Sequence, residues 1–333
     1  MTKTTAKLVK TIATVCAAGL VVAGCSSADE ANTTGESNTS ADSAASAEGK
    51  FTVTDNNGEV ELDAMPEKIV VLDYSVLDVI DSLGKGDSVV LTPTNNNPPA
   101  FAEEYADTAE AGGMSEPDLE AIASAEPDVI LMGARTAREP SLVEELGKIA
   151  PALDYSTDYT EGSLDLNLET AHNLAGLFGE DVQKEADEKI EAIQKRADEL
   201  KEKVEAEDLN ALILMTNGGE THAFAPGSRF GAIHNAFGFK EAAEVKMDGR
   251  YGEVVSFEYI ADADPDYIFV IDRDAARGSD EATAEATLDN PLVQGTKAAQ
   301  NDNIVYLSPE LWYLMGGGIN NVDAMIDEVE ASL

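Results

Sequence analysis

The segment that most constrains the fold of this chain is a long amphipathic stretch near its middle, residues 181–206. Its apolar residues recur at every third or fourth position: Val182, Ala186, Ile190, Ile193, Ala197, Leu200 and Val204. This spacing places them on one face of a helix, which neither Gly nor Pro interrupts. At about 1.5 Å per residue the helix would be roughly 39 Å long, the width of a small domain. We expect a stiff connection between two lobes; the alternative is a surface helix of one large domain.

Strand-like and helix-like segments alternate on both sides of this helix. Short apolar runs predict strands at 68–72, 88–91, 127–132, 211–215, 266–271 and 303–307, besides a hairpin of 51–54 with 59–62. Amphipathic segments predict helices at 76–83, 116–125, 141–149, 164–178, 229–236, 257–260 and 322–329. This alternation is typical of parallel sheets with crossover helices. The predicted fold class is α/β, with two Rossmann-like lobes of mostly parallel sheet joined by one long rigid helix.

Residues 1–24 have the features of a signal peptide. Three lysines precede an apolar run, 11–23, that is too short for a good membrane-spanning helix. The run ends in Leu20-Val-Val-Ala-Gly-Cys25, which resembles the lipobox of bacterial lipoproteins and implies cleavage before Cys25 and a lipid on its sulfur. The alternative is an ordinary secretory signal with a chance cysteine. Because Cys16 lies in the removed segment, no disulfide is expected.

The stretch that follows, 25–49, is rich in Ser, Ala, Thr, Asn, Glu and Gly and has almost nothing to bury. This composition predicts a disordered tether, on the order of 25 Å in root-mean-square length. The rest of the chain is long enough for two domains and a large core. We expect a first α/β lobe at 50–160, connecting helices at 163–206 and a second α/β lobe at 207–333.

The chain is strongly acidic, with 22 Lys and Arg against 64 Asp and Glu and a net charge of −42. Loss of the signal, which holds three lysines and no acid, changes the net charge to −45. Without a basic stripe to displace counterions, a nucleic-acid partner is not expected. Exposed charges are screened beyond roughly 8–10 Å, so the residues of a cleft, rather than the acidic surface, decide what ligand fits.

Arginine is scarce: the seven are Arg135, Arg138, Arg196, Arg229, Arg250, Arg273 and Arg277. An internal repeat connects two of them, since Ala-Glu-Pro-Asp-Val-Ile-Leu-Met at 125–132 resembles Ala-Asp-Pro-Asp-Tyr-Ile-Phe-Val at 263–270, and an arginine follows each. Ligands of open α/β sheets bind beyond the carboxyl ends of the strands, so Arg135 and Arg273 are expected to face each other across a cleft. Guanidinium groups suit anionic oxygens. We assign Arg229 to the same site and Arg196 to a surface ion pair.

No catalytic constellation is present in the sequence. His172, His222 and His234 are isolated from one another, and the motifs Gly-x-Ser-x-Gly and His-Glu-x-x-His are absent. The triplet Gly316–Gly318 lacks the preceding strand and spacing of a dinucleotide-binding loop. We therefore expect neither an enzyme nor an intrinsic cofactor. A secreted α/β oxidoreductase, the remote alternative, would need such a loop.

Four segments together carry a family resemblance: Ala225-Pro-Gly-Ser-Arg-Phe-Gly-Ala-Ile-His-Asn-Ala-Phe-Gly-Phe239, Val255-Ser-Phe-Glu-Tyr-Ile260, Ile268-Phe-Val-Ile-Asp-Arg273 and Trp312-Tyr-Leu-Met-Gly-Gly-Gly318. With the lipobox and the long helix, they resemble the substrate-binding lipoproteins of iron-siderophore ABC importers, over about residues 50–333. The most similar branch is the receptors for catecholate siderophores such as bacillibactin, petrobactin and enterobactin. The resemblance implies a class III periplasmic-binding-protein-like fold that carries ferric iron as a siderophore complex.

The resemblance also implies three cleft arginines that bind the ferric ligand. By motif these are Arg229, Arg273 and one in the loop Gly133–Arg138, where spacing from the strand favours Arg135 and spacing from Lys148 favours Arg138. We choose Arg135 and keep Arg138 as the alternative. A ferric tris-catecholate carries three negative charges, which three guanidinium groups match in number.

Aromatic residues complete the implied site. Trp312 and Tyr313 are expected in a loop that lines the cleft, together with Tyr251. When a siderophore offers only two catechols, the family completes the iron shell with a His and a Tyr. The Tyr corresponds to Tyr313, whereas Tyr251 stands at the His position. Both tyrosines could therefore ligate hard ferric iron as phenolates, or Tyr251 could only stack on a catechol. His222 is a distant substitute.

The remaining implications concern partners and location. Family members dock on an ABC permease through one acidic residue per lobe, for which Glu116 and Glu241 are the candidates here. The resemblance implies a monomer outside the cytoplasm, anchored to the bacterial cell membrane through Cys25. The same scaffold could instead hold a ferric hydroxamate, ferric citrate, haem or a corrinoid. A neutral cargo would leave the arginine cluster unexplained.

Overall fold

The computed structural model describes residues 50–95, 97–157, 164–247, 249–279 and 283–333. The expected signal, the tether and Cys25 lie outside these residues. Within them, no helix is both long enough and apolar enough to cross a membrane. The boundaries given above for the lobes and connecting helices stay predictions.

The first lobe is built on a six-stranded sheet in the order β6-β5-β4-β3-β7-β8, in which every neighbouring pair is parallel except β5 with β6. Its strands are β3 Ile69–Val71, β4 Val89–Thr94, β5 Ala109–Gly113, β6 Glu116–Pro117, β7 Val129–Met132 and β8 Ala152–Asp154. Its helices are α1 Tyr74–Ser82, η1 Gly86–Ser88, η2 Ala100–Tyr105, α2 Leu119–Ala125, α3 Ala134–Ala137 and α4 Pro140–Leu146. The predicted hairpin is confirmed as a separate pair, β1 Phe51–Asp55 with β2 Gly58–Leu62.

The second lobe has a sheet in the order β12-β10-β9-β13-β14, with β11 also paired to β9. Its strands are β9 Asn210–Asn217, β10 Glu220–Phe224, β11 Lys240–Glu241, β12 Glu253–Val254, β13 Tyr267–Asp272 and β14 Ile304–Leu307. The strands β11, β9, β13 and β14 are parallel, whereas β10 and β12 add an antiparallel edge that the sequence patterns did not predict. Its helices are α7 Ala232–Asn235, η4 Gly249–Tyr251, α8 Phe257–Ala263, α9 Arg273–Ala276, α10 Ala284–Leu288, α11 Pro291–Gln294 and α12 Lys297–Gln300.

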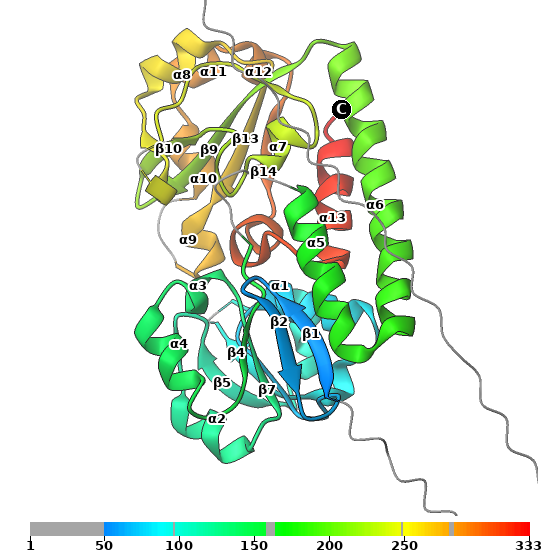
Figure 1. Ribbon diagram of the computed structural model, residues 1–333. Helices are drawn as coiled ribbons and strands as arrows, with labels where there is room; N and C mark the ends of the chain where they lie inside the picture. The colour runs from blue at the N-terminus through cyan, green and yellow to red at the C-terminus, as the bar shows by residue number, and fades with distance from the viewer. Residues whose placement is uncertain (1–49, 96, 158–163, 248, 280–282) are drawn as a thin grey trace, which may run out of the picture. The chain divides into compact units, whose positions relative to one another are not determined.

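The predicted long helix is confirmed as α6, Glu180–Ala206, which follows α5 (Leu164–Ala175) and the short turn η3 (Gly176–Phe178). It packs against α5 and against α13, Asn320–Glu330 (Figure 1). The apolar stripe faces that contact, with Ala186, Ile193, Ala197, Leu200 and Val204 buried. Arg196 forms ion pairs with Asp323, Asp327 and Glu330 of α13, as expected for a surface cation.

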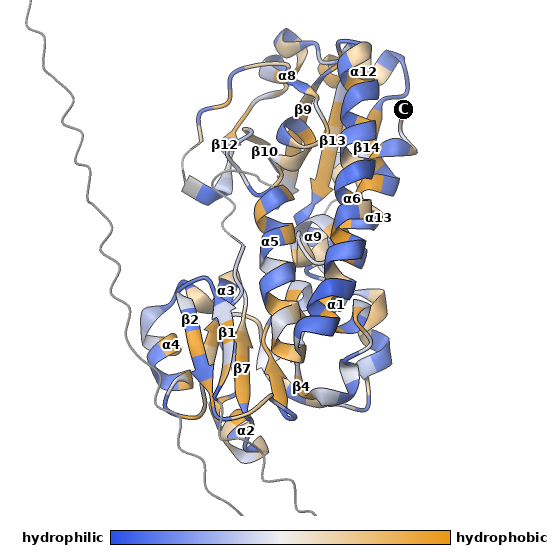
Figure 2. Ribbon diagram, turned by 45° about the vertical axis from the view of Figure 1, so that its right-hand side comes forward, coloured by the Kyte–Doolittle hydropathy of each residue, from blue (hydrophilic) through white to orange (hydrophobic). Residues whose placement is uncertain are grey.

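The core follows the alternation of side chains along the strands. In β9, Ala211, Ile213 and Met215 join the largest apolar cluster, which also includes the buried faces of α5, α6 and α13. Their neighbours Leu212 and Leu214 point to the opposite face and pack in a smaller cluster. Figure 2 shows these sheet strands as hydrophobic, whereas α6 turns a largely hydrophilic surface outward. Burial on both sheet faces explains why the parallel strands are nearly continuous apolar runs.

The C-terminal segment links the two lobes. A π-helix, η5 (Glu310–Met315), ends at Gly316 in a left-handed conformation. Asp78 of α1 then accepts hydrogen bonds from the backbone N–H groups of Ile319, at 2.7 Å, and Asn321, at 3.4 Å. Gly318 (φ +109°) is required here, because a Cβ atom would lie 2.3 Å from the Asp78 carboxylate. This contact ties the start of α13 to the first lobe.

Three local predictions are corrected by the structure. Glu116 and Pro117, expected to open a helix, form strand β6, and α2 begins at Leu119. The helix expected at 229–236 is confined to α7, because residues before it fold into a tight turn in which a Cβ on Gly231 would lie 1.8 Å from the Pro226 carbonyl oxygen. The loop expected around Trp312 and Tyr313 is instead the π-helix η5. A π-helix widens the turn by one residue, and no simple apolar period in the sequence predicts it.

Candidate ligand-binding site

In the first lobe, the site begins where the strand order reverses. The chain runs from β3 outward to β4 and β5 and then returns to β7 on the other side of β3. The loops after β3 and β7 therefore diverge and leave a crevice at the carboxyl ends of the strands. Asp73 follows β3 and Gly133 follows β7, so close together that a Cβ on Gly133 would lie 2.4 Å from the Asp73 side chain. Arg135 stands in the next turn, with Nη1 3.4 Å from Asp73 Oδ2.

The second lobe repeats this arrangement with β9 and β13. Asn217 ends β9 and Arg273 follows β13, and Arg273 Nη1 donates to Asn217 Oδ1. Arg273 Nε donates to the Tyr313 hydroxyl at 2.9 Å. The parallel pairing of neighbouring strands thus places both residues at one edge of the sheet.

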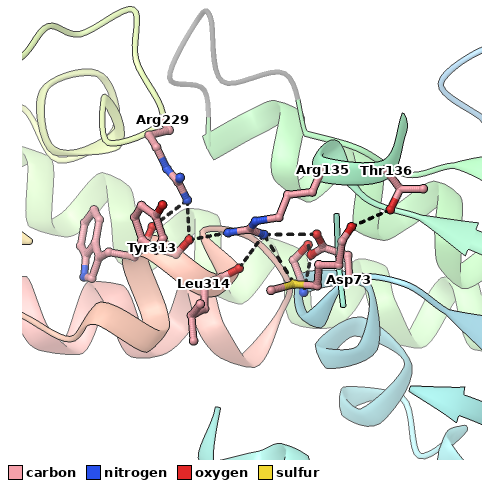
Figure 3. A network of polar contacts seen from close by, with 9 residues as sticks. Asp73, Arg135, Thr136, Arg229, Tyr313 and Leu314 are labelled. Atoms are coloured by element: carbon pink, nitrogen blue, oxygen red, sulfur yellow. Dashed lines mark hydrogen bonds and ion pairs between the residues drawn. The ribbon is translucent and has the colours of Figure 1, made fainter. Parts of the chain in front are cut away.

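Tyr313 is where the three predicted arginines meet. Its carbonyl oxygen accepts from Arg135 Nη2 at 2.8 Å and from Arg229 Nη2 at 2.6 Å (Figure 3). The guanidinium carbon of Arg229 lies 4.6 Å from the centre of its ring. Arg135 Nη1 also donates to the Leu314 carbonyl at 3.1 Å. We call Arg135, Arg229 and Arg273 the inner arginines.

The end of the π-helix explains how these cations can approach one another. The last carbonyl groups of a helix have no partner within it, and its carboxyl end favours cations. Arg135 and Arg229 donate to the carbonyls of Tyr313 and Leu314 in the last turn of η5. Backbone oxygens therefore offset part of the repulsion between the guanidinium groups, with Asp73 as the carboxylate that pairs with Arg135.

The inner arginines open onto a cavity of about 830 Å³ between the two lobes. Six of the seven arginines of the chain line it: Arg135, Arg138, Arg229, Arg250, Arg273 and Arg277. Tyr251 and Tyr313 are also part of the lining. Among the described residues that form its wall there is no carboxylate. In a chain of net charge −42, positive charge is thus concentrated in one place.

The outer part of the cavity carries three exposed arginines, Arg138, Arg250 and Arg277, which we call the rim arginines. Partial burial and the nearby guanidinium groups of Arg250 and Arg135 lower the pKa of Arg138. Arg250 Nη2 donates to the Tyr251 hydroxyl at 2.7 Å, and this hydrogen bond lowers the pKa of Tyr251, a residue that is 58% exposed. The rim is therefore a region of mutual cation repulsion.

Two expected residues do not face the cavity. Trp312 is completely buried, its indole N–H donates to Glu328 Oε2 at 2.8 Å, and its ring packs edge-on against Phe237. The expectation that Trp312 lines the cleft is wrong, because η5 directs Tyr313 toward the cavity and Trp312 into the core. His222 is buried in β10 and is not among the described residues of the cavity wall.

Glu116 and Glu241, the candidates for contact with a permease, are exposed in β6 and β11, one in each lobe.

The described residues hold no group of three or more His, Cys, Asp or Glu side chains placed to bind a metal ion. The chemistry that the wall offers is instead hydrogen bonding from guanidinium groups and contact with two phenol rings. This combination suits a large anionic ligand that has aromatic faces.

Comparison with known proteins decides the family. A family model described as periplasmic binding protein matches residues 69–311, from β3 into η5. The chain belongs to the periplasmic binding protein family. Among curated relatives, it is 33% identical to the petrobactin-binding protein YclQ of Bacillus subtilis (strain 168) over 280 residues, which is 84% of this chain and 86% of YclQ.

Solved structures agree with this assignment to the periplasmic binding protein family. The iron uptake ABC transporter substrate-binding protein PiuA of Streptococcus pneumoniae superposes with a TM-score of 0.79 at 34% identity, over 85% of this chain and 98% of PiuA. The periplasmic catecholate-siderophore binding protein VctP of Vibrio cholerae gives a TM-score of 0.77 at 28% identity, over 85% of this chain and all of VctP. The predicted class III fold is confirmed, and the relatives are binding proteins rather than enzymes.

Sequence reasoning missed Arg250 and Arg277 as members of this periplasmic binding protein's cavity wall. Neither occupies a motif of the family resemblance, and both lie outside the repeat that marked Arg135 and Arg273. The usable signal was composition: arginine is rare in this chain, and most arginines fall in loops between strands and helices. Treating every loop arginine as a candidate would have found both.

Proposed function

We propose that this protein captures a ferric catecholate-type siderophore in the arginine-lined cavity and delivers it to an ABC importer. One observation carries the proposal: six of seven arginines line one cavity whose described wall has no carboxylate, in a chain of net charge −42. A ferric tris-catecholate carries three negative charges and presents aromatic faces. The inner arginines match that charge, and Tyr313 lies among them.

The printed names of the relatives support the same class of cargo. YclQ is named for petrobactin, VctP for catecholate siderophores and PiuA for iron uptake by an ABC transporter. Because the described residues offer no cluster of His, Cys, Asp and Glu, iron would arrive with ligands supplied by the siderophore. For a siderophore with only two catechols, Tyr313 and Tyr251 are our candidates to complete the shell.

We also propose how the protein is attached to the membrane and which residues contact the permease. The lipid on Cys25 would anchor the chain outside the cell membrane, with 25–49 as a tether. Glu116 and Glu241, exposed in different lobes, are the candidates for contact with the permease. The protein would act as a monomer, since the importer has to contact both lobes.

A fluorescence titration tests the choice of cargo. The chain has a single tryptophan, Trp312, next to Tyr313 in η5, so a coloured iron complex in the cavity should quench its emission. We expect quenching at submicromolar concentration by a ferric tricatecholate. A ferric trihydroxamate, which is neutral, should neither quench nor compete. Failure of every ferric catecholate to quench, or equal binding of the hydroxamate, would contradict the proposal, and tighter binding of ferric citrate would replace catecholate as the cargo.

A further inference from the structure

The rim arginines have no place in the network around Tyr313. Arg138 directly follows the short helix α3 of the first lobe, whereas Arg250 and Arg277 belong to the second lobe. All three are exposed and line the cavity. Within the described residues, none of these three arginines forms an ion pair, whereas Arg135 and Arg196 do. The rim therefore holds three guanidinium groups without a described ion pair, and the neighbouring Glu139 only partly offsets the charge of Arg138.

This arrangement has an energetic cost in the empty protein. Like charges that share a cavity repel one another, and the repulsion acts on Arg138 from Arg250 and from Arg135. A surface this rich in acidic residues could easily have supplied a carboxylate at the rim. Its absence from the described wall leaves these positions able to bind an incoming anion.

Counting charge indicates what that anion is. The inner arginines and Asp73, which pairs with Arg135, have a net charge of 3 − 1 = +2. The three rim arginines raise it to +5, which exceeds the three negative charges of a ferric tris-catecholate. Guanidinium groups form two parallel hydrogen bonds with carboxylate or sulfonate, a geometry that lysine cannot offer. All three rim residues are arginine, although the chain has 15 lysines and only 7 arginines.

We propose that the rim arginines are a subsite for anionic groups on the periphery of the chelate, outside the coordination shell of the iron. The preferred cargo is then a ferric catecholate that carries additional carboxylates and more than three negative charges. This inference rests on the proposed function and narrows its substrate class. The rival role for the rim is electrostatic steering, which would accelerate the association of every anionic chelate equally.

Two chelates with one core distinguish these roles. One is the ferric complex of a hexadentate tricatecholamide, and the other is its ring-sulfonated analogue, in which three sulfonates add three negative charges. We expect the full-length protein to bind the sulfonated complex about tenfold more tightly at low salt. The triple variant Arg138→Gln, Arg250→Gln, Arg277→Gln should bind both complexes with equal affinity. A charge-matched control, Lys148→Gln, Lys184→Gln, Lys195→Gln, should keep the tenfold preference.

The other possible outcomes separate failure of the proposed function from failure of the rim subsite. If neither complex binds the wild-type protein, the proposed function fails. If both bind equally to the wild type, or if the triple variant keeps the preference, the subsite is overturned while the proposed function stands. Slower association of both complexes with an unchanged affinity ratio would assign the rim to steering and also overturn the subsite. The single variant Arg277→Gln changes one exposed residue and should lose part of the preference. It provides the test if the triple variant misfolds.

Discussion

The two lobes share one ground plan. The helices α2 and α8 end at Glu126 and Asp264, both in the left-handed conformation, with φ of 49° and 42°. Two residues on, Asp128 accepts the backbone N–H groups of Glu67 and Lys68 before β3, and Asp266 accepts that of Asn210 at the start of β9. The strands β7 and β13 follow and lead to Arg135 and Arg273. The internal repeat of the sequence is therefore a structural repeat that delivers one arginine from each lobe.

The lobes differ in what these equivalent arginines contact. Arg135 donates to two backbone carbonyls of η5 and pairs with Asp73, and its side chain is only 17% exposed. Arg273 contacts two side chains, those of Asn217 and Tyr313. The second lobe also supplies four of the six cavity arginines. Topology thus places the guanidinium groups, while their partners decide whether each one mainly supports the fold or is available to a ligand.

The largest effect should come from the second lobe. The double variant Arg229→Gln, Arg273→Gln removes two inner guanidinium groups and should weaken binding of a ferric tricatecholate at least about 100-fold, since each charge-assisted hydrogen bond contributes about 1.5–3 kcal/mol. Calorimetry measures this. The control Lys195→Gln, Arg196→Gln makes the same charge change on α6 and should keep wild-type affinity. A loss below about threefold in the double variant would show that these two second-lobe arginines do not hold the ligand.

Next in size is the effect of Arg135 on stability. Arg135→Gln leaves the Asp73 carboxylate, 4% exposed, without its cation and removes donors from the carbonyls of Tyr313 and Leu314. We expect the free energy of unfolding to fall by about 2 kcal/mol, measured by urea denaturation. Arg273→Gln, at the equivalent position, should change it by less than about 1 kcal/mol. Equal losses would show that the two arginines have the same role.

A pH-dependent contribution is expected from the contact between the first lobe and α13. Burial raises the pKa of Asp78 from 3.8 to about 7, although the backbone N–H groups of Ile319 and Asn321 oppose the shift. The native state thus holds this proton more tightly than the unfolded state, so the associated stability is present at low pH and is lost as pH rises from about 4 to about 7.

The variant Asp78→Asn keeps an oxygen acceptor but does not titrate. About three pKa units correspond to about 4 kcal/mol, so across that pH range its Tm relative to wild type should rise by roughly 8 °C, measured by calorimetry. A difference in Tm that stays constant with pH would show that Asp78 does not titrate in the native protein.

The smallest effect should come from Tyr251. It lies exposed at the rim, whereas Tyr313 is at the centre of the inner arginines. Tyr251→Phe should weaken binding of a hexadentate ferric tricatecholate by less than about threefold at neutral pH, and Tyr313→Phe by more. Because Arg250 lowers the pKa of the Tyr251 phenol, rising pH should place a phenolate beside the trianionic complex in the wild-type protein, so the loss of affinity in Tyr251→Phe should shrink as pH rises. A changed visible absorption band in Tyr251→Phe would instead indicate that Tyr251 ligates iron.

The sequence could predict those parts of the fold that repeat a period. The stripe of α6 and the apolar runs of β3, β7, β9 and β13 are regular, because each element buries one or both of its faces. The repeat at 125–132 and 263–270 predicted two equivalent arginines, and their positions follow from strand order alone.

The parts that could not be predicted depend on contacts across the chain. The π-helix η5 depends on donors from Arg135 and Arg229, more than 80 residues away in sequence. It reverses the expected exposure of Trp312. The short α7 follows from the close approach of Gly231 to Pro226. Arg250 and Arg277 join the cavity only through the folding of loops, which no local pattern reports.

Native mass spectrometry tests most directly whether arginines of both lobes hold one polyanionic iron chelate. The purified protein would be exposed to spent medium from an iron-starved culture of its own host and transferred intact to the gas phase. We expect one retained ligand per chain, whose mass equals one iron plus a catecholate siderophore, and its absence from Arg229→Gln, Arg273→Gln. Retention of a neutral iron chelate, or equal retention by that variant, would contradict it.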